Sequence, residues 1–575
     1  MIKVLTTNKV FGYLVAASLV TSAGLYLAVR YLIHHIPFLS NPVVSLYVGH
    51  LQRGLIAFPI VVAAAWSCRV LHIRPETIPQ RLYRRLEPYY PFVMLAIFFI
   101  LLLFIANFAY QRIPQGDAVG VFFQTKTFAL GKLYVAPPVY PQFFTMPAVI
   151  VHNSKWFCFY SPGHALILLV GYLLRLTWLV GPVLGVMSLY LMYSVARMMY
   201  GFTVARKVLA LGVFSPFLLF LSATHDFHTG SVFFTTVCLF LVSKMEVRDR
   251  PYLSPLLGLS VGFVFLCRPY TGFLIGLTIL IYLAARQPRR IVGYLAGGIP
   301  VVILHMIYNQ ALMGNPFTLP YQALASYHGV GFSPDYGGAT FGLTGHSLLK
   351  AAVNLFYNLF VLSIHLFGWP ILAGATILLL FLFKKDSYHY LLLGTIGSLF
   401  GGHLLYWFHG IAPYGPKYIS EALPAFIILS AKALDSLPLL LTKTKKDGDL
   451  ALVRESIPRF VFLLVLSNLL VYLPFQFQYF RSGQWGENPK IWQAVTKAGV
   501  TNAVVFVTER SERNTRFFSS AFIFNDPELK GDIIFARDLG PENDKLIKCF
   551  PKRNLCLIDQ GDLAVKPYAP KLNSR

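Results

Sequence analysis

One acidic residue stands alone in a long polar loop that ends near residue 163. Between Arg85 and Glu246 the chain has only three acids, Glu87, Asp117 and Asp226. The loop holds Asp117 together with the basic residues Arg112, Lys126, Lys132 and Lys155. A lone carboxylate in this company predicts a general base or a metal ligand that works beside a negatively charged group. The simpler alternative is a helix N-cap, because apolar residues follow Asp117 at helical spacing.

A second polar cluster lies in the short turn His225-Asp226-Phe227-His228. Two histidines and one aspartate are suited to a divalent ion such as Mg, Mn or Ca, or to orienting a sugar hydroxyl. The alternative is a capping network between two helices. No cofactor is certain from the sequence. Asp335, in a loop rich in glycine, predicts an ordinary turn.

Cations and aromatic residues gather near the ends of two predicted spans. Arg268 precedes Pro269 and Tyr270, and it either snorkels to the interface or binds an anion. His403, Tyr406, His409, Tyr414 and Lys417 follow a later span, and Glu421 either pairs with Lys417 or belongs to the site. Cations at the depth of a lipid headgroup fit a lipid-linked phosphate. One base plus such cations is what glycosyl transfer from a polyprenyl phosphate needs.

The elements that must position these residues are membrane helices. Hydrophobic residues make up 56% of the 575 residues and charged residues only 13%, against about 25% charged in soluble domains. The net charge of +25 is explained by basic residues on the cytoplasmic side of a membrane. No basic helix or stacking platform for nucleic acid is present.

Apolar runs predict an α-helical polytopic membrane protein with about 13 spanning helices. They lie at 10–30, 52–71, 92–110, 178–199, 207–222, 230–244, 254–268, 271–285, 290–308, 363–384, 388–407, 419–441 and 457–475. Clusters of Lys and Arg then fall on one side, which places the N-terminus in the cytoplasm and predicts an inner-membrane protein. Residues 163–175 and 346–362 are predicted as helices at the outer interface.

The predicted units are residues 1–110 (first spanning helices), 111–177 (a large outer loop), 178–483 (the remaining helices with outer loop 309–362) and 484–575. The last unit reads as a small extracytoplasmic α/β domain. Strand-like runs at 501–508, 532–536 and 554–558 alternate with helical patterns at 489–498 and 542–550. Cys549 and Cys556 could form a disulfide in an oxidising compartment.

Several motifs resemble one known family. They are Gly116-Asp117-Ala118, Gln124-Thr125-Lys126, Tyr160-Ser161-Pro162-Gly163-His164, Arg268-Pro269, Tyr308-Asn309, Gly314-Asn315-Pro316, Phe367-Gly368-Trp369-Pro370, His409-Gly410, Tyr414-Gly415-Pro416-Lys417-Tyr418 and Ala536-Arg537-Asp538-Leu539-Gly540. This pattern is similar to bacterial GT-C-type glycosyltransferases related to protein O-mannosyltransferases and aminoarabinose transferases. The resemblance covers most of residues 90–575.

The resemblance implies an inverting transferase that uses a polyprenyl-phosphate sugar on the outer face of the membrane. Asp117 would be the catalytic acid of the first loop. Many relatives have a second acid nearby, whereas Ala118 and Val119 follow here. A metal would therefore need His225, Asp226 or His228.

The sequence as a whole predicts a membrane glycosyltransferase with Asp117 as base and a glycan, lipid or protein acceptor. Residues expected to bind donor or substrate are Lys417, Arg268, Lys126, His409, Tyr414, His164 and Glu421. A flippase for lipid-linked glycans would instead show inverted repeats and ionisable residues deep in the spans. A polymerase or ligase with lipid-diphosphate donors would show paired outward arginines. Neither pattern is clear in the sequence.

Overall fold

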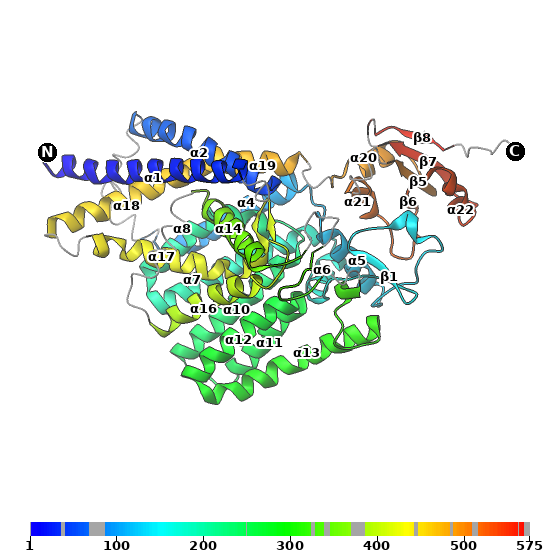
Figure 1. The fold of residues 1–575 in the computed structure, drawn as a ribbon, viewed down its shortest axis with the longest axis horizontal. Helices are drawn as coiled ribbons and strands as arrows, with labels where there is room; N and C mark the ends of the chain where they lie inside the picture. The colour runs from blue at the N-terminus through cyan, green and yellow to red at the C-terminus, as the bar shows by residue number, and fades with distance from the viewer. Residues whose placement is uncertain are drawn as a thin grey trace.

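The computed structural model describes residues 2–35, 41–67, 85, 87–248, 250–323, 328–337, 345–369, 386–441, 447–482, 487–508, 516–559, 561 and 563–568. Long helices form one body, and a small α/β domain lies at its end (Figure 1). In the described ranges, nine helices are long and apolar enough to cross a membrane, and a bent pair would make ten. The chain is therefore a polytopic helical membrane protein.

The helical body is assembled from elements spread over most of the chain. Its helices are α1 (Ile2–His35), α2 (Pro42–Ser67), α4 (Tyr90–Phe104), α7 (Thr177–Tyr200), α8 (Phe202–Val213), α9 (Pro216–Ser222), α10 (Phe227–Val247), α11 (Leu253–Cys267), α12 (Pro269–Arg286), α13 (Ile291–Met313), α14 (Leu348–His365), α16 (Ser387–His403), α17 (Leu423–Leu441), α18 (Asp447–Ser467) and α19 (Leu473–Arg481). Short helical turns link them: η4 (Glu87–Tyr89), η5 (Ile105–Ala109), η7 (Pro288–Arg290), η8 (Pro320–Ala323), η10 (Lys417–Ala422) and η11 (Asn468–Tyr472).

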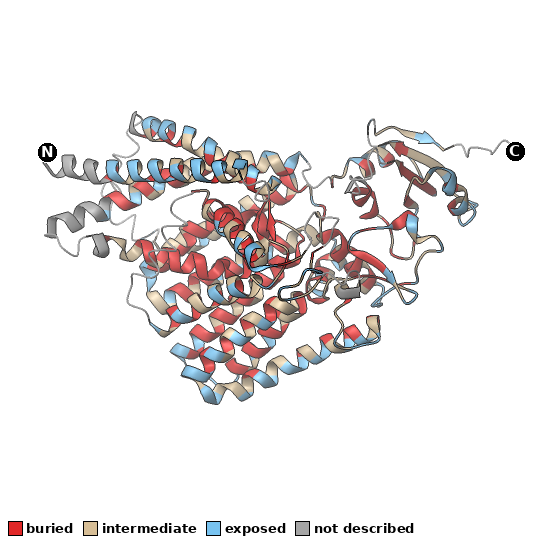
Figure 2. Ribbon diagram, in the orientation of Figure 1, coloured by how far each residue is buried: buried red, intermediate tan, exposed pale blue. Residues whose placement is uncertain are grey.

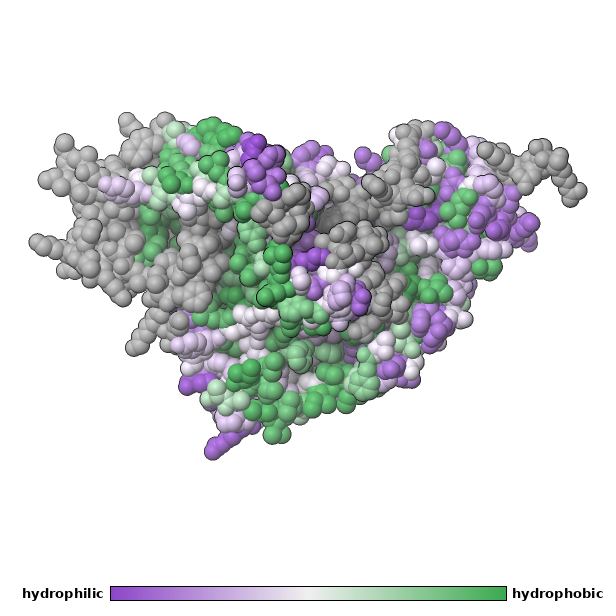
Figure 3. All heavy atoms as spheres, viewed as in Figure 1, coloured by the Kyte–Doolittle hydropathy of each residue, from purple (hydrophilic) through white to green (hydrophobic). Residues whose placement is uncertain are grey.

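The interior of this body is apolar and tightly packed. Figure 2 shows buried residues concentrated in its centre, around α7, α8, α10 and α17. The outer surface of α13 is also apolar, with Val292, Leu304 and Ile307 exposed. Figure 3 shows apolar side chains on the outside of this region and polar ones towards the C-terminal domain. An apolar exterior over long helices is what contact with lipid requires.

The predicted count of thirteen spans is not confirmed. The predicted span 363–384 falls mostly on residues 370–385, outside the described residues. Residues 346–362, expected at the interface, instead form α14 (Leu348–His365), which is long and apolar enough to cross. The predicted span 207–222 is divided between α8 and α9, which are bent by 63° because Ser215 caps a new helix before Pro216.

The polar loop that follows η5 is ordered by two short α-helices, one 3-10 turn and a hairpin. They are α5 (Ala118–Ala129), η6 (Pro141–Phe144), β1 (Val149–His152), β2 (Lys155–Cys158) and α6 (Gly163–Leu173). A Cβ on Gly120 would lie 2.5 Å from the Ala148 Cβ, and one on Gly163 would lie 2.6 Å from the Leu266 carbonyl carbon. These close approaches join the first turn of α5 to the hairpin and α6 to the end of α11.

The C-terminal domain is a four-stranded sheet in the order β6-β5-β7-β8. Its strands are β5 (Ala503–Thr508), β6 (Ile533–Arg537), β7 (Asn554–Asp559) and β8 (Val565–Pro567), and its helices are α20 (Lys490–Lys497), α21 (Arg516–Phe522), η12 (Gly540–Glu542) and α22 (Asn543–Ile547). The central strand β5 pairs in parallel with β6 and β7. The residues of β5 are buried and rich in valine, which is typical of a strand covered on both faces in the centre of a parallel sheet. The thiols of Cys549 and Cys556 are free, so the suggested disulfide is absent.

Candidate functional site

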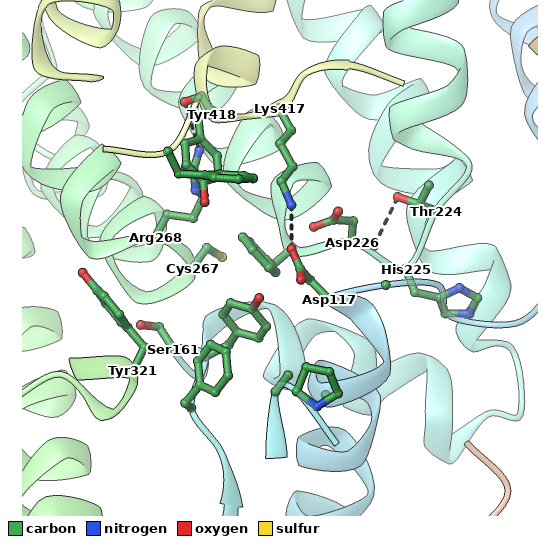
Figure 4. Close-up of a pocket in the computed structure, with 18 of the residues that line it drawn as sticks. Asp117, Ser161, Thr224, His225, Asp226, Cys267, Arg268, Tyr321, Lys417 and Tyr418 are labelled. Carbon is green, nitrogen blue, oxygen red and sulfur yellow. Dashed lines mark hydrogen bonds and ion pairs between the residues drawn. The ribbon is translucent and has the colours of Figure 1, made fainter. Parts of the chain in front are cut away.

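A cavity of about 850 Å³ lies where the polar loop, the helical body and the C-terminal domain meet. Its wall includes Asp117 at the start of α5 and Arg268 between α11 and α12. Tyr414 and Lys417 enter from the hairpin formed by β3 (Ile411–Ala412) and β4 (Gly415–Pro416). Figure 4 shows the Asp117 carboxylate at the centre, with Lys417 above it and Arg268 to one side.

Asp117 occupies the N-cap position of α5, but its side chain does not cap the helix. Gly116 has a φ of +57°, a conformation that glycine adopts at no steric cost. The turn directs the Asp117 carboxylate into the cavity. The positive end of the α5 dipole favours a negative charge at this position. The N-cap alternative is therefore wrong for the side chain, although the helix begins where that alternative placed it.

Lys417 forms an ion pair with Asp117 across 300 residues of sequence. The Lys417 Nζ lies 2.6 Å from the Asp117 Oδ2, with the lysine side chain 12% exposed and the aspartate 35% exposed. Burial alone would raise the pKa of the Asp117 carboxyl. The charge of Lys417, with hydrogen bonds from Lys417 and Tyr160, outweighs burial and holds the pKa of Asp117 below its usual value. The carboxylate is therefore ionised at neutral pH.

Arg268 is held by a buried carboxylate. Its Nη1 lies 2.9 Å and 2.8 Å from the two carboxylate oxygens of Glu421. The Glu421 side chain is fully buried and that of Arg268 is 11% exposed. The predicted pairing of Glu421 with Lys417 is therefore wrong, because each cation has a different acid. Glu421 supports the wall from behind instead of lining it.

The histidine turn is a capping network. Asp226 accepts a hydrogen bond from the His228 backbone N–H at 3.3 Å, which caps α10, and another from the Tyr414 hydroxyl. The His228 Nδ1 lies 3.1 Å from the Ser420 hydroxyl. Figure 4 shows the His225 ring turned away from Asp117.

These side chains point to different partners, so they do not form the suggested metal site. Among the described residues, no group of three His, Cys, Asp or Glu side chains could hold a metal ion. The alternative of a capping network describes Asp226 and His228 correctly. His225 and Asp226 still line the cavity, whereas His228 lies behind it.

Lys126 does not reach the cavity, contrary to the sequence-based expectation. It lies on the last turn of α5, facing the C-terminal domain. Its Nζ donates to the carbonyl oxygens of Ile523 at 2.6 Å and Asn525 at 3.0 Å. Burial lowers the pKa of this amine to about 8. Lys126 therefore joins the C-terminal domain to the helix that begins at Asp117.

We expect Lys126→Met to loosen the C-terminal domain. The substitution leaves two carbonyls without their part-buried donor, at a cost of about 1 kcal/mol. Hydrogen exchange of α21 should therefore become faster. The matched control is Lys132→Met, because the Lys132 side chain is 50% exposed in its pair with Glu528 and such pairs contribute little. Equal exchange in the two variants would contradict the assignment.

Of three other expected residues, two lie behind the cavity wall and one lines it. His409 hydrogen-bonds to Asn41 and to the Ile411 N–H, and it is not part of the cavity wall. His164 is fully buried, with its Nε2 3.1 Å from the His225 carbonyl oxygen. Tyr414 lines the cavity and donates to Asp226.

The cavity also contains residues that sequence reasoning missed. Glu487 and Ser519 enter from the C-terminal unit, and both are buried. Neither lies in a recognisable motif, so no local signal marks them. The missed residues also include Tyr321, Trp407 and Phe408, which complete an aromatic part of the wall together with Tyr270, Tyr406 and Tyr418, already named from the sequence. Arg268 lies over the Tyr418 ring at 5.3 Å, a cation–π contact that fixes this wall.

No protein-family model matches the sequence, and no curated protein matches it. Solved structures do. ArnT from Cupriavidus metallidurans in the apo state superposes with a TM-score of 0.54 at 14% identity, over 84% of this chain and 94% of ArnT. The same protein bound to undecaprenyl phosphate gives 0.50 at 12% identity, over 82% and 92%. An oligosaccharyltransferase from Archaeoglobus fulgidus gives 0.43 at 12% identity, over 77% and 61%. The two ArnT comparisons show that the chain shares the overall fold of ArnT, as the sequence led us to expect.

Proposed function

We propose that the chain is a membrane glycosyltransferase that takes a sugar from a polyprenyl-phosphate donor. The observation that carries the proposal is the Asp117–Lys417 pair in the wall of the 850 Å³ cavity. A buried ammonium suited to phosphate lies against a carboxylate suited to proton removal. ArnT, which shares the fold, has been solved bound to undecaprenyl phosphate, and this supports a lipid phosphate as the donor group.

The donor phosphate would compete with Asp117 for Lys417. In the ion pair, Asp117 is a weak base because its pKa is lowered. A phosphate that engages Lys417 draws the ammonium away from the carboxylate. Binding of the donor therefore raises the basicity of Asp117, so the carboxylate becomes a stronger base only when the donor is bound.

The reaction then follows from one proton transfer and one displacement. Asp117 removes the proton of an acceptor hydroxyl as that oxygen attacks the anomeric carbon. The bond between this carbon and the phosphate oxygen breaks, and the polyprenyl phosphate leaves with the electron pair. Lys417 stabilises the charge on the departing phosphate. Attack opposite the leaving group inverts the anomeric centre.

The acceptor would be a glycan, a lipid or a protein of the cell envelope, reached from the extracytoplasmic face. Basic clusters on the opposite side of the predicted spans support this orientation. Glu487 and Ser519 would meet the acceptor from the C-terminal domain, because both line the cavity with Asp117.

We expect Lys417→Gln to weaken binding of undecaprenyl phosphate by roughly 10- to 100-fold, since a charge-assisted hydrogen bond contributes about 1.5–3 kcal/mol. It should also shift the acid limb of the pH profile of kcat/KM upwards. Without Lys417, burial raises the pKa of Asp117, so the base is protonated at a higher pH. Unchanged lipid affinity, measured with the purified protein in nanodiscs, would contradict the role of Lys417.

A donor comparison separates this function from the alternatives. Purified protein is incubated with polyprenyl-phosphate and polyprenyl-diphosphate sugars, and both sugar transfer and lipid translocation are scored. We expect transfer from the monophosphate donor. Transfer only from the diphosphate would indicate a polymerase or ligase, and translocation without transfer would indicate a flippase.

A further inference from the structure

The segment that carries Lys417 is a tight hairpin, residues 410–417, called here the Lys417 hairpin. Ile411 pairs with Pro416 and Ala412 with Gly415. The Lys417 N–H donates to the Gly410 carbonyl oxygen at 2.9 Å. A Cβ on Gly415, whose φ is +122°, would lie 2.7 Å from the Phe217 ring. The hairpin is therefore closely packed, and its position determines the position of the Lys417 backbone, from which the side chain extends.

The tip of the hairpin is held by two donors from distant helices. The Tyr47 hydroxyl, on α2, donates to the Pro413 carbonyl oxygen at 2.8 Å and lies 3.3 Å from that of Ala412. The Gln476 amide, on α19, donates to the same Pro413 oxygen. Both side chains are fully buried. Neither belongs to the cavity wall, so neither would touch a bound substrate.

The base of the hairpin is held in the same manner. The Asn358 amide, on α14, donates to the His409 carbonyl oxygen at 2.8 Å. The Asn41 amide, just before α2, lies 3.2 Å from the His409 Nε2. Two residues that flank the start of α2 thus reach the hairpin, one at its tip and one at its base. In Figure 1, α2 and α19 lie along the upper edge of the helical body, with α14 below them.

We propose that Tyr47 and Gln476 are positioning residues for Lys417. They hold the Pro413 carbonyl and so set the place of the ammonium that meets the donor phosphate. The N-terminal helix α2 would then support the site as well as anchor the chain in the membrane. The inference rests on the proposed role of Lys417 in binding a lipid phosphate.

Tyr47→Phe tests this by measuring the binding of undecaprenyl phosphate to the 575-residue chain in nanodiscs. Loss of one buried hydrogen bond should weaken binding about fivefold. The matched control is Tyr294→Phe, which removes a buried hydroxyl that donates to the Gly276 carbonyl oxygen at 2.9 Å, away from the cavity wall. The two variants should lower the thermal midpoint similarly, whereas only Tyr47→Phe should weaken lipid binding. Gln476→Leu should act like Tyr47→Phe.

A double-mutant cycle distinguishes positioning from general loosening of the fold. In a Lys417→Gln background, Tyr47→Phe should have no further effect on lipid affinity, because its effect passes through the lysine. The same fivefold loss in both backgrounds would overturn the inference and leave the proposed function intact. Equal lipid binding by the unsubstituted protein and by Lys417→Gln would overturn the proposed function itself.

Discussion

Asp117→Asn should lower the rate of sugar transfer by roughly a thousandfold, within the 10²- to 10⁴-fold range of general base catalysis. The amide keeps the shape of the side chain but does not accept the acceptor proton. Lys417 loses its ionic partner, which lies 2.6 Å away, and is freed for the donor phosphate. Affinity for undecaprenyl phosphate should therefore be retained or increased while transfer is lost.

The control for this prediction is Asp335→Asn. Asp335 is an exposed residue of a turn in which its backbone N–H donates to the Ser333 hydroxyl at 3.2 Å. The chemical change is identical, and the residue is not part of the cavity wall. Activity should match that of the unsubstituted protein. Turnover by Asp117→Asn within a few fold of the Asp335→Asn rate would remove Asp117 as the base.

The second large effect is on stability. We expect Glu421→Gln to lower the free energy of unfolding by about 3–5 kcal/mol, because it leaves the Arg268 guanidinium without its buried counter-charge. Both Glu421 oxygens lie within 2.9 Å of the Arg268 Nη1. Unfolding in mixed micelles measures the change.

A more exposed ion pair gives the comparison. The Lys207 and Asp435 side chains are 36% and 30% exposed, at 2.7 Å. Asp435→Asn should cost no more than about 1 kcal/mol, as is usual for pairs near solvent. If Glu421→Gln and Asp435→Asn destabilise the protein equally, the Arg268–Glu421 pair is not the buried bridge described here.

Sequence reasoning singled out Asp117 and Lys417 separately, each by its local surroundings. It did not predict that they meet, since 300 residues lie between them. It assigned Lys126 to phosphate because this lysine lies near Asp117 in the chain. On α5, however, the two side chains face different neighbours, and Lys126 donates to carbonyls just after α21 instead. Nearness in sequence was a poor guide here because helical geometry separates residues that are close in the chain.

The histidine turn failed as a metal site for a similar reason. Its composition suits a cation, yet Asp226 is used by the α10 N-terminus and by Tyr414. The residue types show which metal ligands a segment contains. Only the directions of the side chains decide whether those ligands can meet at one ion. The residue pattern was also a poor guide for α14. It suggested an amphipathic helix at the interface, but the helix is long and apolar enough to cross a membrane.

The sequence by itself determined that this is a helical membrane protein with a small α/β unit at its end. Apolar run length and strand periodicity are local properties, and lipid leaves few alternatives to a helix. It also determined that Asp117 is a rare acid among many cations. The tertiary structure alone decided that Lys417 is its partner, that Arg268 belongs to Glu421, and that Tyr47 and Gln476 hold the Lys417 hairpin. These contacts join helices far apart in the chain, and only the packing of the whole bundle brings them together.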